Sequence, residues 1–178
     1  MRGMTALVDQ APLLKRLPLP AEVCVLAAVT SSFLLQAVGF ALFLGGAVAW
    51  GVAPAAAAWL WLPALGLLAW ALAAGLALAL APLHLVARDT AHVMTAVMTV
   101  WFFASPVLYA LDQLPAPVAT AMALNPFTAV VGAVRAIVLG LDLPGALAWA
   151  SCVVVVVGSW TLGAWLLARA SGRLDEFW

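Results

Sequence analysis

The chain has 178 residues, of which 67% are hydrophobic and only 8% charged, and its formal net charge at pH 7 is zero. An ordinary soluble domain carries about 25% charged residues, so this composition excludes a soluble fold. The longest basic run is the pair Lys15 and Arg16, which is too short for the electrostatic footprint of a nucleic-acid-binding protein. The sequence therefore predicts an all-α, polytopic transmembrane helix bundle, with a single membrane domain over residues 1–178 and no nucleic-acid partner.

The first residues of the chain are mixed in character and precede a long apolar stretch. A secretory signal peptide would place basic residues directly before a short apolar segment, so the first span is predicted to be a mature membrane helix. Residues 1–22 before it are predicted to be a cytoplasmic segment from the distribution of basic residues. No charged side chain occurs from Val23 to Ala87. Since a spanning helix needs about 20 predominantly apolar residues, this stretch predicts two spans, at 23–50 and 59–86, joined by a short external turn.

Two further spans are predicted at 91–111 and 144–168. The apolar stretch at 115–140 differs from them, because Asn125 and Pro126 lie near its middle. Proline lacks a backbone donor and disfavours helical geometry in the residue before it. We therefore expect two half-helices that meet at a turn and form a re-entrant hairpin, which enters the membrane without crossing it.

The distribution of basic residues supports a hairpin that does not cross. Lys and Arg in short loops concentrate on the cytoplasmic side of a membrane. If the hairpin crossed, the cytoplasmic excess would fall to four against two, and Arg135 would lie within the span. If it does not cross, only Arg135 is external and the pattern predicts cytoplasmic N- and C-termini, with a tail at 169–178. The six basic residues that are then cytoplasmic are Arg2, Lys15, Arg16, Arg88, Arg169 and Arg173.

A polar group interrupts the apolar sequence between the second and third spans. Arg88 and Asp89 are flanked there by His84 and His92. The loop either contacts a partner or is a solvated turn whose charges fix the topology. The types of residue at 84, 89 and 92 also ligate metals or act as acid and base in enzymes. The histidines are about two helical turns apart, which disfavours a compact metal site, and no metal is expected.

The end of the third span combines bulky aromatic residues with a proline. An interfacial aromatic belt would explain them, and so would a kinked gate whose aromatic faces carry sugar rings. Arg135 also has two interpretations, since a charge at membrane depth usually marks a pathway, whereas one on a shallow half-helix snorkels to the surface. The residues at the end of the span are Trp101, Phe102, Phe103, Ser105, Pro106 and Tyr109.

Motifs of nucleotide hydrolysis and of acyl transfer do not occur in the sequence. It has neither a GxxxxGK[ST] phosphate loop nor a Gly-x-Ser-x-Gly nucleophile elbow. We therefore expect no ATPase site, no enzymatic activity and no cofactor in this chain. Any energy source must come from another chain.

The polar landmarks form a recognisable series when taken in order. Residues 13–22 read LLKRLPLPAE, residues 85–89 read LVARD, residues 105–109 read SPVLY and residues 124–128 read LNPFT, with Arg135 and Gly140 beyond. This series resembles the ABC-2 type permeases that export polysaccharides, teichoic acids and polyol phosphates, including O-antigen and capsule exporters. The first segment departs from the family pattern Phe-Pro-Arg-Glu, because Leu19 and Ala21 replace Phe and Arg.

The resemblance implies the transmembrane permease subunit of an ABC exporter in the bacterial inner membrane. Two copies would pair as a homodimer in the lipid bilayer and dock two ATP-binding cassette subunits, which hold the ATP and Mg. The substrate would be a polysaccharide or a lipid-linked glycan. Residues implied in coupling to the ATPase are Leu14, Lys15, Arg16, Pro20, Glu22, Arg88 and Asp89. Residues implied in the channel and its gate are Trp101, Phe102, Phe103, Ser105, Pro106, Tyr109, Asn125, Pro126 and Arg135.

Members of this family usually begin with an amphipathic interface helix and two spans that have no counterpart in this sequence. That difference is expected of a fragment, a truncated gene or a start codon placed too late. Three alternatives stay open beside a glycan exporter. They are an ABC-2 permease for drugs or lipids, a membrane enzyme that uses His84, Asp89 and His92, and a non-transporting assembly subunit.

Overall fold

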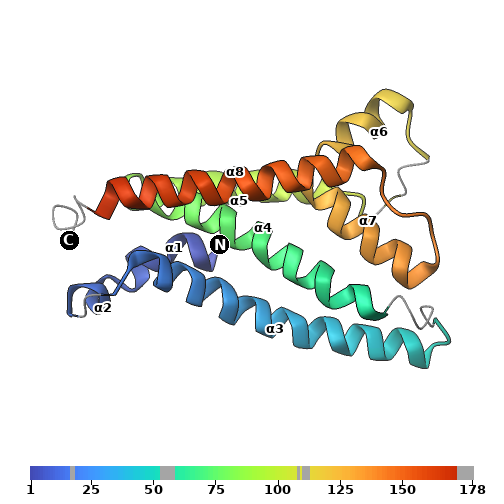
Figure 1. Ribbon diagram of the computed structural model, residues 1–178, viewed down its shortest axis with the longest axis horizontal. Helices are drawn as coiled ribbons and strands as arrows, with labels where there is room; N and C mark the ends of the chain where they lie inside the picture. Colours follow the sequence, from blue (N-terminus) through green and yellow to red (C-terminus); the bar gives the residue numbers. More distant parts are fainter. Residues whose placement is uncertain (17–18, 53–58, 108, 110–112, 172–178) are drawn as a thin grey trace. The chain divides into compact units, whose positions relative to one another are not determined.

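The computed structural model describes residues 1–16, 19–52, 59–107, 109 and 113–171. The chain is mainly helical over these ranges and forms no strand in them, which confirms the all-α prediction (Figure 1). The helices are α1 (Arg2–Asp9), α2 (Ala11–Arg16), α3 (Ala21–Ala49), α4 (Trp61–Val86), α5 (Thr90–Phe103), α6 (Ala116–Ala123), α7 (Pro126–Leu139) and α8 (Ala146–Ser171).

Three of the predicted spans are long unbroken helices. α3, α4 and α8 have 29, 26 and 26 residues, which exceeds the about 20 that a bilayer requires. Each is long and apolar enough to cross a membrane. Large apolar side chains are exposed along them, among them Leu35, Leu67 and Val154. In a membrane such faces contact lipid, so their exposure is favourable there.

The predicted span at 91–111 is shorter as a helix. α5 ends at Phe103 after 14 residues, which is about 21 Å at 1.5 Å per residue, whereas a hydrocarbon core is about 30 Å thick. The reason is Pro106, which removes a backbone donor and restricts Ser105 before it. The Ser105 Oγ also donates to the Trp101 carbonyl at 2.8 Å, within the last turn of the helix. Residues 108 and 110–112 of the expected span lie outside the described residues.

The predicted break at Asn125 and Pro126 is confirmed. Figure 1 shows α6 and α7 as two short helices that meet at a sharp bend, and their axes differ by 101°. Asn125 caps α7, because its side chain accepts a hydrogen bond from the Phe127 amide at 3.0 Å. Pro126 follows at a position where a helix needs no donor, and Gly140 ends α7 with a φ of +68°. Re-entry without crossing stays a prediction.

By its internal contacts the chain divides into two compact units. Unit 1 comprises residues 1–34, residues 70–98 and the chain from 156 onward. Unit 2 comprises residues 35–69 and residues 99–155. The long helices α3, α4 and α8 contribute residues to both units, as does α5.

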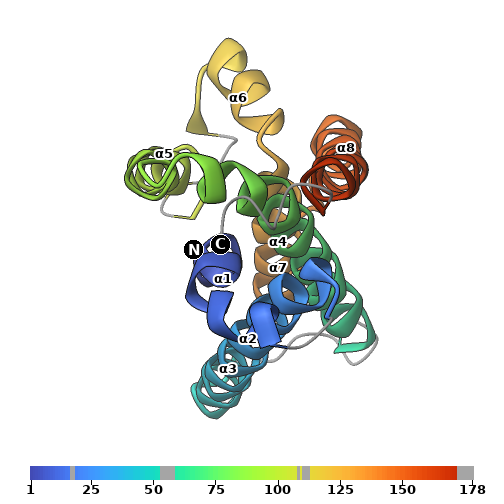
Figure 2. The same ribbon diagram turned by 90° about the vertical axis from the view of Figure 1, so that its left-hand side faces the viewer.

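Unit 1 has an apolar core against which the N-terminal helix packs. Figure 2 draws α1 beside the first half of α3, and Leu7 of α1 is fully buried in a cluster that includes Val25 and Ala74. A Cβ at Gly3 would overlap the Val29 side chain. The absence of a side chain at Gly3 therefore allows α1 to approach α3 this closely.

Tryptophan side chains add hydrogen bonds between the helices of unit 1. Trp70 Nε1 donates to the Thr30 hydroxyl at 3.1 Å, and Trp160 Nε1 donates to the Ala71 carbonyl at 2.8 Å. The two indole rings also pack against each other, with centroids 6.2 Å apart. These contacts join α3 to α4 and α4 to α8 within this unit.

Candidate functional site

The predicted channel residues lie in unit 2, where hydrogen bonds link several of them. Asn125 is buried, and its Nδ2 donates to the Ala104 carbonyl at 3.2 Å and to the Ser105 hydroxyl at 3.0 Å. Its Oδ1 is already engaged by the Phe127 amide. The helix cap thus fixes the side chain of Asn125 and directs its donor to the end of α5.

Arg135 lies on α7 and contacts the backbone that follows α5. Its Nη1 donates to the Pro106 carbonyl at 2.7 Å and to the Tyr109 carbonyl at 2.5 Å. The side chain is half-buried. A guanidinium has five N–H donors and no acceptor, which suits a group of free carbonyls. Arg135 therefore joins α7 to residues that precede it by 29 and 26 positions.

Some aromatic side chains at this site contact α6 or α7, and others are exposed. The Tyr109 hydroxyl donates to the Phe103 carbonyl at 2.9 Å and lies 3.4 Å from the Met122 sulfur. Trp101 packs edge-on against Phe127 of α7, with centroids 5.2 Å apart. Phe102 and Phe103 contact each other edge-on and are exposed.

Two hydroxyl groups at this site were not singled out by the sequence. Thr128 is fully buried and donates to the Met122 carbonyl at 2.7 Å, and Ser151 of α8 donates to the Ala123 carbonyl at 3.1 Å. Both satisfy carbonyls at the end of α6. The partner of each hydroxyl is a backbone carbonyl of another helix, which no pattern of residue types in the sequence records.

The predicted coupling residues all belong to unit 1. Arg88 and Asp89 are exposed on the tight turn from α4 to α5. The Ala87 carbonyl accepts from both the amide and the hydroxyl of Thr90, at 3.0 and 2.6 Å, which fixes the turn. In the segment from Leu14 to Glu22, Leu14 is partly buried and packs on the unit 1 core. Pro20 is exposed and Glu22 is half-buried. Lys15 and Arg16 lie in α2, and their side chains are outside the described part of the chain.

The residues considered for a metal or an acid–base site differ in their surroundings. His84 is buried, and its Nδ1 has no hydrogen-bond partner, whereas His92 and Asp89 are exposed. Among the described residues, no group of three or more His, Cys, Asp or Glu side chains could hold a metal ion.

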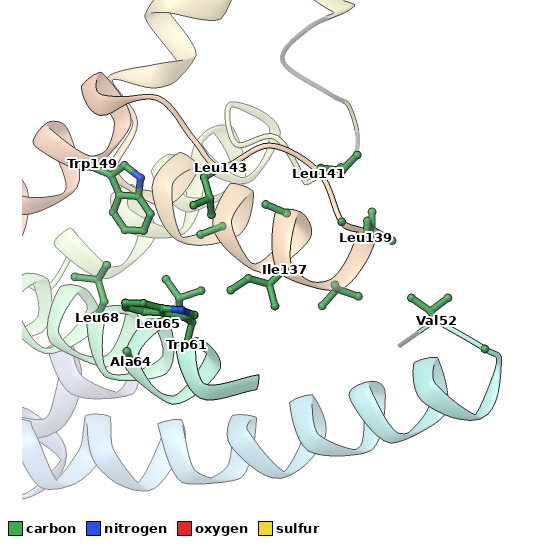
Figure 3. A pocket seen from close by; sticks show the side chains of 15 residues that line it. Val52, Trp61, Ala64, Leu65, Leu68, Ile137, Leu139, Leu141, Leu143 and Trp149 are labelled. Carbon is green, nitrogen blue, oxygen red and sulfur yellow. The ribbon is translucent and has the colours of Figure 1, made fainter. Parts of the chain in front are cut away.

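Unit 2 also contains an apolar cavity of about 950 Å³ that the sequence did not indicate. Figure 3 shows Trp61 and Leu65 of α4 on one side and Ile137 of α7 on the other. Trp149 also lines the cavity, and its Nε1 donates to the Pro144 carbonyl at 3.1 Å. None of the nine predicted channel residues is among the residues that line it.

Comparison with known proteins agrees with the order of the polar landmarks. The sequence model of the ABC-2 type transporter family matches residues 13–139. The chain is also 30% identical over 146 residues to the O-antigen export system permease protein RfbA of Myxococcus xanthus. That alignment covers 81% of this chain and 56% of the relative, so the chain spans little more than half of the curated relative's length. The chain belongs to the ABC-2 type transporter family, as a membrane protein with several spanning helices.

Proposed function

We propose that this chain is the permease part of an ABC exporter that moves a polysaccharide or a lipid-linked glycan across the bacterial inner membrane. The family match over residues 13–139 carries the proposal, because it includes both the exposed turn and the broken helix pair. The name of the relative, an O-antigen export permease, supports a glycan as substrate. Energy would come from a separate ATP-binding cassette subunit, which holds ATP and Mg.

The ATP-binding subunit is proposed to dock on unit 1. Arg88 and Asp89 are exposed on a turn whose backbone is held by Thr90, so the partner would meet a fixed pair of opposite charges. The segment from Leu14 to Glu22 belongs to the same unit. Charged groups at the rim of such an interface set the register and the rate of docking more than its affinity.

The path for the substrate is proposed to form with a second copy of the permease. The end of α5 and the pair α6 and α7 would line its external part. Phe102 and Phe103 are exposed there and offer apolar faces to sugar rings. Both termini would then be cytoplasmic, in agreement with the excess of basic residues on that side.

Export of a drug or a lipid is the second candidate, and the apolar cavity of unit 2 favours it. Two indole rings, Trp61 and Trp149, line this cavity together with aliphatic side chains, and none of the described residues that line it is charged. Such a lining suits an apolar ligand better than a glycan.

The test of coupling compares two exposed aspartates. The assay uses cells that lack their own exporter and that produce this permease together with its ATP-binding subunit. In these cells Asp89→Ala should lower the amount of glycan at the cell surface about fivefold, as expected for the loss of one exposed charge contact. Asp142, exposed in unit 2, provides the matched control Asp142→Ala. Equal export by both variants would contradict docking at the turn. Absence of surface glycan in the unaltered system, with export of a lipid or drug, would favour the second candidate.

The proposed orientation is tested by thiol labelling from outside the cell. Cys24 and Cys152 are buried and are replaced by alanine in the parent chain. Gln113→Cys, at an exposed position, should react with an impermeant reagent, and Asp89→Cys should react only after the membrane is opened. The reverse pattern would contradict cytoplasmic termini.

A further inference from the structure

The early end of α5 creates a problem that a membrane makes severe. The last four carbonyls of any helix have no partner within the helix. At the surface of a membrane, water satisfies them, but no water is present in the hydrocarbon core, where each unpaired group costs several kcal/mol. α5 stops after 14 residues, about 9 Å short of the thickness of that core.

The structure provides a donor for each carbonyl from Val100 to Pro106. Two of these donors are side chains of α7 and its cap, and two are side chains of the turn itself. Backbone amides serve three of these carbonyls: Ala104 N donates to Val100 (2.9 Å), Ser105 N to Phe102 (3.2 Å) and Val107 N to Ser105 (2.7 Å). Side chains of the turn serve two, because Ser105 Oγ donates to Trp101 (2.8 Å) and Tyr109 OH to Phe103 (2.9 Å). Side chains of α7 and its cap serve the other two, because Asn125 Nδ2 donates to Ala104 (3.2 Å) and Arg135 Nη1 to Pro106 (2.7 Å).

The distant donors are the ones that replace water. Asn125 reaches Ala104 across 21 positions of the sequence, and Arg135 reaches both Pro106 and Tyr109. The C-terminal end of a helix carries a partial negative charge, which attracts a guanidinium. The positive charge of Arg135 is therefore compensated by carbonyl dipoles at the end of α5.

We propose that Ser105, Tyr109, Asn125 and Arg135 form a carbonyl-capping cluster that lets α5 end inside the bilayer. Arg135 is then a positioning residue that holds the turn after α5 against α7. It does not select an anionic substrate by its charge. The placement of the carbonyl-capping cluster on the export path rests on the proposed function, whereas its role as a cap does not.

Hydrogen exchange of the full chain in lipid nanodiscs tests this role without transport. Arg135→Met removes the donor to the Pro106 and Tyr109 carbonyls, so the amides of residues 104, 105 and 107 should exchange about tenfold faster, which equals about 1.4 kcal/mol of easier opening. Arg135→Lys keeps a cation with three donors and should restore part of the protection. Arg169→Met is the matched control, since Arg169 is exposed in α8 and contacts the face of Trp165.

The results separate the cap from the transport proposal. Faster exchange at residues 104, 105 and 107 in Arg135→Met, with residues 22–34 of unit 1 unchanged, supports the cap whether or not a glycan is exported. Exchange at these three amides that stays within about twofold of the unaltered chain would overturn it. If Arg135→Met unfolds the whole chain, the lysine variant decides, because exchange in Arg135→Lys as fast as in Arg135→Met also overturns it.

Discussion

The two units of this chain solve the same membrane problem in different ways. In unit 1, the long helices are continuous and satisfy most of their own backbone groups, except where Pro82 of α4 has no N–H to donate. Close contacts such as Gly75 against Trp160 hold them together. In unit 2, α5 ends early and α6 and α7 meet at a bend, so side chains such as Asn125 and Arg135 must satisfy the backbone. The comparison shows why the polar landmarks of this apolar chain gather at the breaks.

The largest effect on stability is expected at Asn125, where one side chain serves two functions. Asn125→Ala removes the cap of α7 and the donor to Ala104, which together should cost about 2–4 kcal/mol. Asn125→Ser retains a capping oxygen and should cost less. Thermal unfolding in detergent measures both. If the alanine variant were as stable as the serine variant, the cap would contribute nothing.

In unit 1, stability is expected to depend on the close packing of helices, which an added side-chain atom would disturb. A Cβ at Gly163 of α8 would lie 2.7 to 2.9 Å from Leu78 and Ala79 of α4, including backbone atoms, so Gly163→Ala should cost about 1–3 kcal/mol. Gly158 of the same helix has no atom within 4 Å of such a Cβ. Gly158→Ala should therefore be neutral or slightly stabilising. Equal unfolding temperatures for the two variants would contradict close packing of α8 on α4.

A smaller effect is expected for the indole hydrogen bonds of unit 1. Trp160→Phe keeps an aromatic ring but loses the donor to the Ala71 carbonyl, which should cost about 0.6–1.7 kcal/mol. Trp165 of the same helix is half-exposed and serves as the control Trp165→Phe. A denaturant titration that ranks Trp165→Phe as the more damaging substitution would contradict the importance of this hydrogen bond.

The sequence predicts those parts of the fold whose cause is local. Twenty apolar residues in a row must span a bilayer as a helix, which located α3, α4 and α8. Asn125 followed by Pro126 disfavours a continuous helix, which located the bend between α6 and α7. In both cases the physical constraint lies within a few residues of its consequence.

The parts that escaped prediction depend on distant contacts. Apolar run length extended the third span to residue 111, past Pro106, whose effect on the helix is local. The sequence does not reveal that side chains of α7 and its cap then satisfy the carbonyls after Phe103. The partners of Arg135 are backbone carbonyls, and no pattern of residue types records them. The cavity between Trp61 and Ile137 likewise depends on the approach of α4 to α7.

The capping of broken helices by side chains is tested most directly at Tyr109. Because the chain contains one tyrosine, growth with tyrosine that carries ¹³C in its carbonyl labels only the Tyr109 carbonyl, one of the two carbonyls that accept from Arg135. Infrared spectra of the chain in lipid should show the labelled carbonyl band at the low frequency of a hydrogen-bonded group. We predict that Arg135→Met shifts this band to higher frequency and that Arg169→Met leaves it in place. A band that does not move in Arg135→Met would contradict the proposed cap.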